Sequence, residues 1–169
     1  MIDDKFLNCV EMFQHACGFC DCANLSFEKG LYGGNSGFLL VPVGVNSAFA
    51  CEVFLKILLK IHNVDNKKSH NLKSLFELLP DKLKNSIKTH LQNCHLWKDA
   101  LGQENLDIIS NAFNSWRYIY EHDFSNGGTV WIDCGFLNIF RDLLREICCQ
   151  KIYGKTWEEY KKGDNNGRK

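Results

Sequence analysis

Proline is scarce in this sequence, in which only Pro42 and Pro80 occur among 169 residues. Because proline removes a backbone donor and interrupts helix interiors, a chain with so little of it can form long helices. Both prolines stand beside glycines or a capping residue, so we expect them at element boundaries. The sustained alternation of apolar and polar residues that marks half-buried strands is also missing. The sequence therefore predicts an all-α fold.

Neither sign of charge is in excess, since Lys and Arg together number 20, as do Asp and Glu. Sequence-independent binding to nucleic acids depends on many basic side chains that neutralise phosphates. A neutral chain excludes an electrostatic footprint of that kind spread over the whole surface. Any contact with a polyanion must therefore come from a local patch.

Long hydrophobic runs are absent as well. The strongly apolar stretches, such as residues 53–61, are interrupted by lysine and fall short of the roughly 20 residues that span a bilayer. The N-terminus lacks the basic-then-apolar order of a signal peptide. We expect a cytoplasmic protein without membrane contact, folded as a single domain over residues 1–162 with a disordered tail at 163–169.

The cysteines number nine, an odd count that favours reduced thiols over a disulfide framework in a chain without a leader. A compact cluster of side chains of metal-ligand type lies near the N-terminus and comprises His15, Cys17, Cys20 and Cys22. On a continuous helix only Cys17 and Cys20 share a face. We expect no metal and no cofactor, and a small zinc-stabilised domain is the weaker alternative.

Apolar residues recur at helical spacing over most of the chain, which predicts an up-and-down bundle of about five or six helices. Residues 43–62 are apolar on nearly every side, as the central helix of a bundle is. Other helices are expected at residues 3–23, 70–79, 103–121 and 131–153, and after Pro80. The expected buried stripes are Phe6, Leu7, Val10, Phe13 and Cys17; Leu72, Leu75, Phe76 and Leu79; Leu106, Ile109, Phe113, Trp116 and Tyr120; and Phe136, Leu137, Phe140, Leu144 and Ile147.

Capping residues and glycines mark the expected boundaries of these helices. Ser69 is predicted to cap the helix at residues 70–79, and Asp81 to cap the next one. Residues 28–37, with the sequence EKGLYGGNSG, contain four glycines. A regular element is not expected there, so the segment is predicted to be a surface loop.

Three segments, in the same order, are similar to those of the HEPN family, the helical domains named for higher eukaryotes and prokaryotes nucleotide-binding. The family's second long helix, with its small-residue start and an inward acid followed by Leu-Lys, resembles NSAFACEVFLKILLK at residues 46–60. The family's His-(Asp or Asn)-Leu-x-x-Leu segment resembles SHNLKSLFELLP at residues 69–80. The third segment, NSWRYIYEH at residues 114–122, holds Arg117 and His122 at the spacing of the Arg-x4-6-His motif.

The resemblance implies a homodimer in which two copies of the motif meet across a twofold axis and form one metal-independent site for cutting single-stranded RNA. Arg117 would stabilise charge on the phosphate, and His122 would act as general acid or base during attack by the 2′-hydroxyl of the RNA. A guanidinium forks onto phosphate oxygens, and an imidazole exchanges protons near neutral pH, so the residue types suit both roles. Cleavage would leave a cyclic phosphate.

The motif departs from the family's catalytic pattern at two positions. The residue after the motif arginine, usually a small polar one, is Tyr118, and the position two beyond the histidine, a tyrosine in some toxin members, is Phe124. On an unbroken helix Arg117 and His122 would also point about 140° apart. They converge only if the helix ends before His122 or if one of them comes from the partner subunit.

Our first hypothesis is an endoribonuclease in a toxin–antitoxin, antiphage or stress-response system. Arg117 and His122 are its catalytic pair, and Asn114 and Tyr118 line the site. Its partners would be a second copy of the chain, single-stranded RNA as substrate, and an antitoxin or another defence-system protein.

The second hypothesis is a catalytically silent HEPN module that binds a partner protein or a nucleotide-like ligand. Arg117 would then be turned inward and paired with Glu121 or Glu52. Glu52 and Lys56 are four apart, in the Glu-then-Lys order that suits an ion pair on a helix. We expect this pair to be structural or, in a sharper version, to position Arg117.

Overall fold

The computed structural model describes residues 4–32, 36–65, 69–94, 105–110, 112–118, 121 and 133–165. Its helices are α1 (Asp4–Tyr32), α2 (Ser36–Ile61), α3 (Leu72–Glu77), α4 (Asp81–Asn93), α6 (Ala112–Arg117), α7 (Cys134–Tyr153) and α8 (Trp157–Asn165). Residues 105–109 are also helical. Since no residue in the described ranges belongs to a strand, the predicted all-α class is confirmed.

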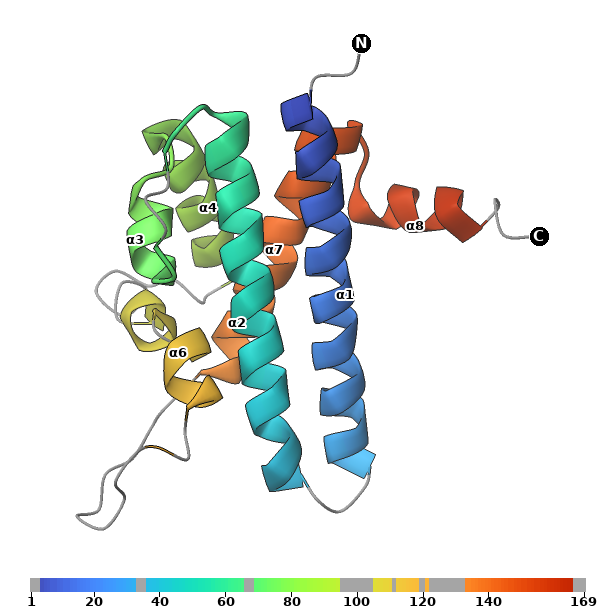
Figure 1. Cartoon of the computed structure of the whole chain (residues 1–169), viewed down its shortest axis with the longest axis vertical. Helices are drawn as coiled ribbons and strands as arrows, with labels where there is room; N and C mark the ends of the chain where they lie inside the picture. Colours follow the sequence, from blue (N-terminus) through green and yellow to red (C-terminus); the bar gives the residue numbers. More distant parts are fainter. Residues whose placement is uncertain are drawn as a thin grey trace.

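Helix α2 is the centre of the structure. The two longest helices, α1 and α2, lie side by side and antiparallel, and α7 packs against both (Figure 1). Helices α3 and α6 pack on α2 as well, and α8 packs on α7. Side chains on several sides of α2, including Phe54, Ile57 and Leu58, are fully buried. The prediction of a central helix at residues 43–62 is therefore confirmed.

The buried face of α1 consists mostly of small side chains: Cys9, Phe13, Ala16, Cys20 and Ala23. Of the predicted stripe, Phe13 is fully buried, but Phe6 and Leu7 are 44% and 51% exposed. The predicted stripe was therefore wrong at these two positions. Alanine and cysteine, rather than the largest apolar side chains, let α1 and α2 lie close together.

The predicted loop at residues 28–37 is wrong at both ends. Helix α1 continues to Tyr32 and α2 begins at Ser36, while residues 33–35 lie outside the described part. Gly30 is buried inside α1. A glycine costs a helix about 1 kcal/mol relative to alanine, which the packing of two long helices along their length outweighs.

Pro42 lies inside α2 rather than at its boundary, which corrects the prediction. Proline cannot donate the backbone hydrogen bond that a helix makes at that position. Asn46, one turn later, donates its side-chain amide to the carbonyl oxygen of Pro42 at 2.9 Å. Pro80 does mark a boundary, because it is the N-cap residue of α4. Asp81, predicted to be the cap, is instead the first residue of that helix.

The helix predicted at residues 103–121 is interrupted at Ser110. The carbonyl oxygen of Ser110 accepts from the backbone N–H of Leu72 at 3.0 Å, and its hydroxyl accepts from that of Lys73 at 3.3 Å. Ser110 thus satisfies the first donors of α3 instead of continuing its own helix. Leu106, Ile109 and Trp116 are buried as predicted.

The N-cap of α3 is Asn71, not Ser69 as predicted. The side-chain oxygen of Asn71 accepts from the backbone N–H of Ser74 at 2.8 Å, which is the usual capping bond. The hydroxyl of Ser69 accepts instead from the backbone N–H of Asn71, at 3.2 Å. Asn71 also accepts from the hydroxyl of Ser110 at 3.0 Å, so one side chain joins α3 to the interrupted helix.

Helix α7 corresponds to the last helix that was predicted, at residues 131–153. Helix α8 was not predicted. The predicted stripe of α7 is buried at Phe136, Leu137, Phe140 and Leu144. In α8, the backbone N–H of Trp157 donates to Glu146 at 2.9 Å, and the guanidinium of Arg145 lies 4.7 Å from the Trp157 ring. Because α8 reaches Asn165, the first residues of the predicted tail are helical, and residues 166–169 lie outside the described part.

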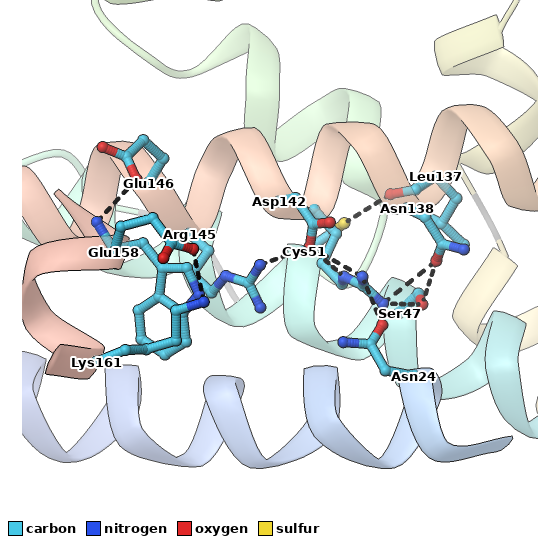
Figure 2. A network of polar contacts seen from close by, with 12 residues as sticks. Asn24, Ser47, Cys51, Leu137, Asn138, Asp142, Arg145, Glu146, Glu158 and Lys161 are labelled. Carbon is cyan, nitrogen blue, oxygen red and sulfur yellow. Dashed lines mark hydrogen bonds and ion pairs between the residues drawn. The ribbon is translucent and has the colours of Figure 1, made fainter. Parts of the chain in front are cut away.

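A buried arginine joins α1, α2 and α7. Arg141, on α7, is only 2% exposed. Its guanidinium donates to Asn24 of α1 at 2.9 Å, to Ser47 of α2 at 3.0 Å and to Asp142 at 2.9 Å. Figure 2 shows the acceptor side chains from these helices around one point. A buried guanidinium is tolerated only when its donors are paired in this way.

Among the described residues, one helix has the length and composition of a candidate membrane span, over Leu39–Ile61. This span is longer than the apolar stretch at residues 53–61, because α2 continues through Pro42. About half of this span is buried inside the protein, as the core helix of a bundle is. The cytoplasmic location stays a prediction.

Replacing Arg141 with Met should lower the free energy of unfolding by about 3 kcal/mol, because Asn24, Ser47 and Asn138, whose side-chain oxygen accepts from Arg141 at 3.3 Å, lose a shared donor in the interior. Urea unfolding followed by far-UV circular dichroism measures the change. Lys151→Met, at an exposed position of the same helix, is the control and should change stability by less than about 0.5 kcal/mol. Equal stability of the two variants would contradict the structural role of Arg141.

Two glycine substitutions should change stability in opposite directions. Gly154, which ends α7, has a φ of 65°, so Gly154→Ala should destabilise the protein by about 1 kcal/mol. Gly18 lies within α1 with no atom within 4 Å of an added Cβ, so Gly18→Ala should stabilise it by roughly 0.5–1 kcal/mol. Thermal unfolding of both variants measures the signs, and two shifts in the same direction would refute this account.

Candidate functional site

Arg117, the last residue of α6, is exposed and lies over two aromatic rings. Its guanidinium carbon is 4.9 Å from the centre of the Phe113 ring and 4.4 Å from that of the Tyr118 ring. Its Nη2 also contacts the Tyr118 hydroxyl. Contacts of this kind orient an arginine without neutralising its charge. The guanidinium therefore contacts two rings and belongs to an exposed residue.

No carboxylate pairs with Arg117 in the part of the chain that the structure describes. Glu121 is exposed, and its backbone N–H donates to the carbonyl oxygen of Tyr118 at 2.9 Å. Glu52 is only 2% exposed and binds other cations. Neither of the two ion pairs expected for a structural Arg117 is formed, and the arginine is turned outward.

Glu52 binds Lys56 and His70. Its Oε1 lies 2.7 Å from Nζ of Lys56, which confirms the ion pair predicted from their spacing. The same oxygen lies 2.9 Å from Nδ1 of His70. The other oxygen, Oε2, is buried without a hydrogen-bond partner among the described residues. The acid is thus fixed by its own helix on one side and by an imidazole from the approach to α3 on the other.

His70 was not among the predicted site residues. Its side chain is 54% exposed, although Nδ1 contacts a buried acid. The only sequence signal for it was its place in the SHNLKSLFELLP segment, one of the three that resemble HEPN domains. Its contact with Glu52 joins residues 18 positions apart, which no local spacing rule anticipates.

The ring of Phe113 contacts both His70 and Arg117. The centres of the His70 and Phe113 rings are 6.5 Å apart, with their planes inclined by 29°. On α2, the Phe49 ring stacks on the same phenyl ring at 5.1 Å. Arg117 also contacts Phe113, so the guanidinium and the imidazole belong to one region of the surface. We call Glu52, Lys56, His70, Phe113 and Arg117 the α2–α6 site.

The remaining predicted site residues lie partly outside the described part. Asn114 is in α6, but its side chain is not described, and His122 is not described at all. Helix α6 ends at Arg117, and Tyr118 lies in a turn. Whether Arg117 and His122 converge stays a prediction, because His122 lies outside the described residues.

The cysteines do not form a reactive or metal-binding centre where they are described. All nine are free thiols. Within the described ranges, no three His, Cys, Asp or Glu side chains come together as a metal site. Burial raises the pKa of the Cys20 thiol to about 11 and that of Cys51 well above its ordinary value. Such thiols stay protonated at neutral pH and are poor nucleophiles.

Comparison with known proteins finds no family model, curated protein or solved structure that matches this chain. Its function is therefore inferred from its own residues. The α2–α6 site offers a buried carboxylate, an imidazole with one exposed edge and an outward guanidinium. These groups suit proton transfer and the binding of an anion.

The raised thiol pKa of Cys20 predicts a stability change at high pH. The unfolded chain loses this proton near the ordinary value of 9.0, whereas the folded protein keeps it up to about 11. The unfolding free energy should therefore fall as pH rises through that window. Urea titrations of the wild type, Cys20→Ala and the exposed control Cys22→Ala measure the slope, which Cys20→Ala alone should reduce. An unchanged slope in Cys20→Ala would contradict the assignment.

Proposed function

We propose that the protein is a metal-independent endoribonuclease of the HEPN type, acting in a toxin–antitoxin, antiphage or stress-response system. The observation that carries this proposal is the outward guanidinium of Arg117, which is oriented by Phe113 and Tyr118 and has no ion-pair partner in the described part of the chain. A free, oriented guanidinium at a surface is suited to bind a phosphate. The alternative with an inward, paired arginine lacks this support.

In the proposed reaction Arg117 holds the scissile phosphate and stabilises the charge that develops on its oxygens. His122 exchanges a proton with the reacting hydroxyl groups. The 2′-hydroxyl oxygen attacks phosphorus and the bond to the 5′-oxygen breaks. One product then ends in a 2′,3′-cyclic phosphate and the other in a 5′-hydroxyl, so no metal ion or added water is needed for this step.

The proposed homodimer would bring two such arginines together. Exposed apolar side chains flank the segment that carries Arg117: Ile108 is 40% exposed and Tyr118 is 37% exposed. Side chains of this kind favour burial against a second surface. An antitoxin or another defence-system protein would act by covering the same region.

A silent binding module remains the second candidate, because one contact favours it. The Tyr118 hydroxyl meets Nη2 of Arg117 at the position where catalytic family members usually have a small polar residue. In that case the same surface would bind a partner protein or a nucleotide-like ligand without cutting RNA. The cleavage experiment separates the two functions.

The wild type should cut a mixed-sequence single-stranded RNA in the presence of EDTA. Arg117→Ala and His122→Ala should each lower the rate by about 10² or more, because each removes a group that acts in the transition state. Arg117→Lys should remain slow, since lysine keeps the charge but not the forked donors. Gel electrophoresis measures cleavage, and the cyclic phosphate end is identified by mass spectrometry.

Lys82→Ala, at an exposed position of α4, is the matched control and should cut at the wild-type rate. Light scattering and circular dichroism should show all variants to be folded in the same oligomeric state as the wild type. If folded wild type leaves RNA intact under all conditions that preserve the dimer, the silent binding module is the better function.

A further inference from the structure

We propose that His70 is a further catalytic residue of the α2–α6 site and acts as the general base that takes the proton of the 2′-hydroxyl. This inference rests on the proposed ribonuclease function. It adds a residue that lies outside the Arg117 and His122 motif and is brought to the site by tertiary structure alone.

The contact with Glu52 determines which nitrogen of His70 is free to accept a proton. Oε1 of Glu52 also pairs with the ammonium group of Lys56 at 2.7 Å, so this acid is a carboxylate and can only accept hydrogen bonds. Nδ1 of His70, at 2.9 Å from the same oxygen, must then be the donor. In the neutral imidazole this leaves the lone pair on Nε2, which is the form that a general base requires.

Glu52 is buried and His70 is exposed, which suits a positioning acid and a general base. Glu52 is 2% exposed, so it is held in the interior and cannot exchange partners with solvent. The His70 side chain is 54% exposed, so a substrate can reach it. A histidine that only completed the hydrogen bonding of a buried acid would gain nothing from this exposed edge.

The position of His70 relative to Arg117 completes the geometry. Both contact the ring of Phe113, His70 by facing it and Arg117 by a cation–π contact. In this proposal, a phosphate bound to Arg117 would lie close enough to His70 for its imidazole to act on the neighbouring 2′-hydroxyl. Of the charged groups in the described structure, Glu52 contacts His70 directly, Lys56 shares the Oε1 atom of Glu52, and Arg117 shares the Phe113 ring.

Cleavage of RNA by its own 2′-hydroxyl needs two proton movements on opposite sides of phosphorus. Nε2 of His70 accepts the proton of the 2′-hydroxyl as the 2′-oxygen forms its bond to phosphorus. His122 donates a proton to the 5′-oxygen as the bond between that oxygen and phosphorus breaks. His70 returns its proton to solvent and His122 regains one, so the protons balance over a turnover without an oxidant, reductant or metal.

The test compares ordinary RNA with RNA in which sulfur replaces the bridging 5′-oxygen at one linkage. Sulfur leaves without being protonated, so this substrate dispenses with the general acid but still needs the base. His70→Ala should cut both substrates about 10²–10⁴ times more slowly than the wild type. His122→Ala should be slow on ordinary RNA and should recover on the sulfur substrate.

Added imidazole should restore part of the rate of His70→Ala, because the vacated site is open to solvent, and should do nothing for Arg117→Ala. Glu52→Gln should also be slow, because Glu52 acts only by orienting His70. The double variant with His70→Ala should therefore be no slower than His70→Ala. His90→Ala, at an exposed position of α4, is the matched control and should keep the wild-type rate. Circular dichroism checks that each variant is folded.

Three results would overturn the proposal while leaving the ribonuclease function intact. His70→Ala could cut at the wild-type rate, it could be slow without any rescue by imidazole, or it could recover on the sulfur substrate, which would make His70 the acid. Failure of the wild type to cut either substrate would instead overturn the ribonuclease function, and the role of His70 with it.

Discussion

The buried guanidinium of Arg141 is the interaction on which the rest of the structure depends. It donates hydrogen bonds to one side chain of α1, to one of α2 and to others of its own helix α7. It therefore fixes the three longest helices relative to one another. Apolar packing alone is not directional, whereas a planar group with several donors specifies one arrangement. The position of α2 follows from it, and α2 carries Glu52 and Phe49.

The α2–α6 site is built on that fixed helix from two shorter pieces. His70 reaches Glu52 from the approach to α3, and Phe113 lies against Phe49 from α6. Ser110 and Asn71 tie the two pieces to each other by hydrogen bonds. The α2 helix thus provides the acid and an aromatic surface, while the short helices bring the imidazole and the guanidinium to it.

The parts that could be predicted from the sequence are those set by local spacing. The Glu52 and Lys56 pair follows from a four-residue interval, and the stripe on α7 follows from large apolar side chains at helical spacing. The contact between His70 and Glu52 and the acceptors of Arg141 join residues distant in sequence, so no periodicity reveals them. Arg117 was predicted as a site residue from a resemblance. The sequence left open whether its guanidinium points outward or is turned inward to pair with Glu121 or Glu52.

The failures have a common physical origin in tertiary contacts that override local preference. Gly30 and Pro42 would each end an isolated helix, yet both lie within long helices that gain more from packing against each other than these residues cost. Ser110 fails to continue a helix for the opposite reason, since its carbonyl oxygen is taken by Leu72 of another segment.

The hydrogen bonds between Ser110, Asn71 and the start of α3 have a dynamic consequence. Helices α3 and α6 have six residues each, too few to be stable in isolation, so each depends on the other and on α2. We therefore expect them to behave as one cooperative unit that opens at a lower free energy than global unfolding. Opening would withdraw the imidazole and the guanidinium at once and leave Glu52 on α2. A ligand or second subunit that binds the closed unit stabilises it by mass action, so site assembly and recognition are thermodynamically coupled.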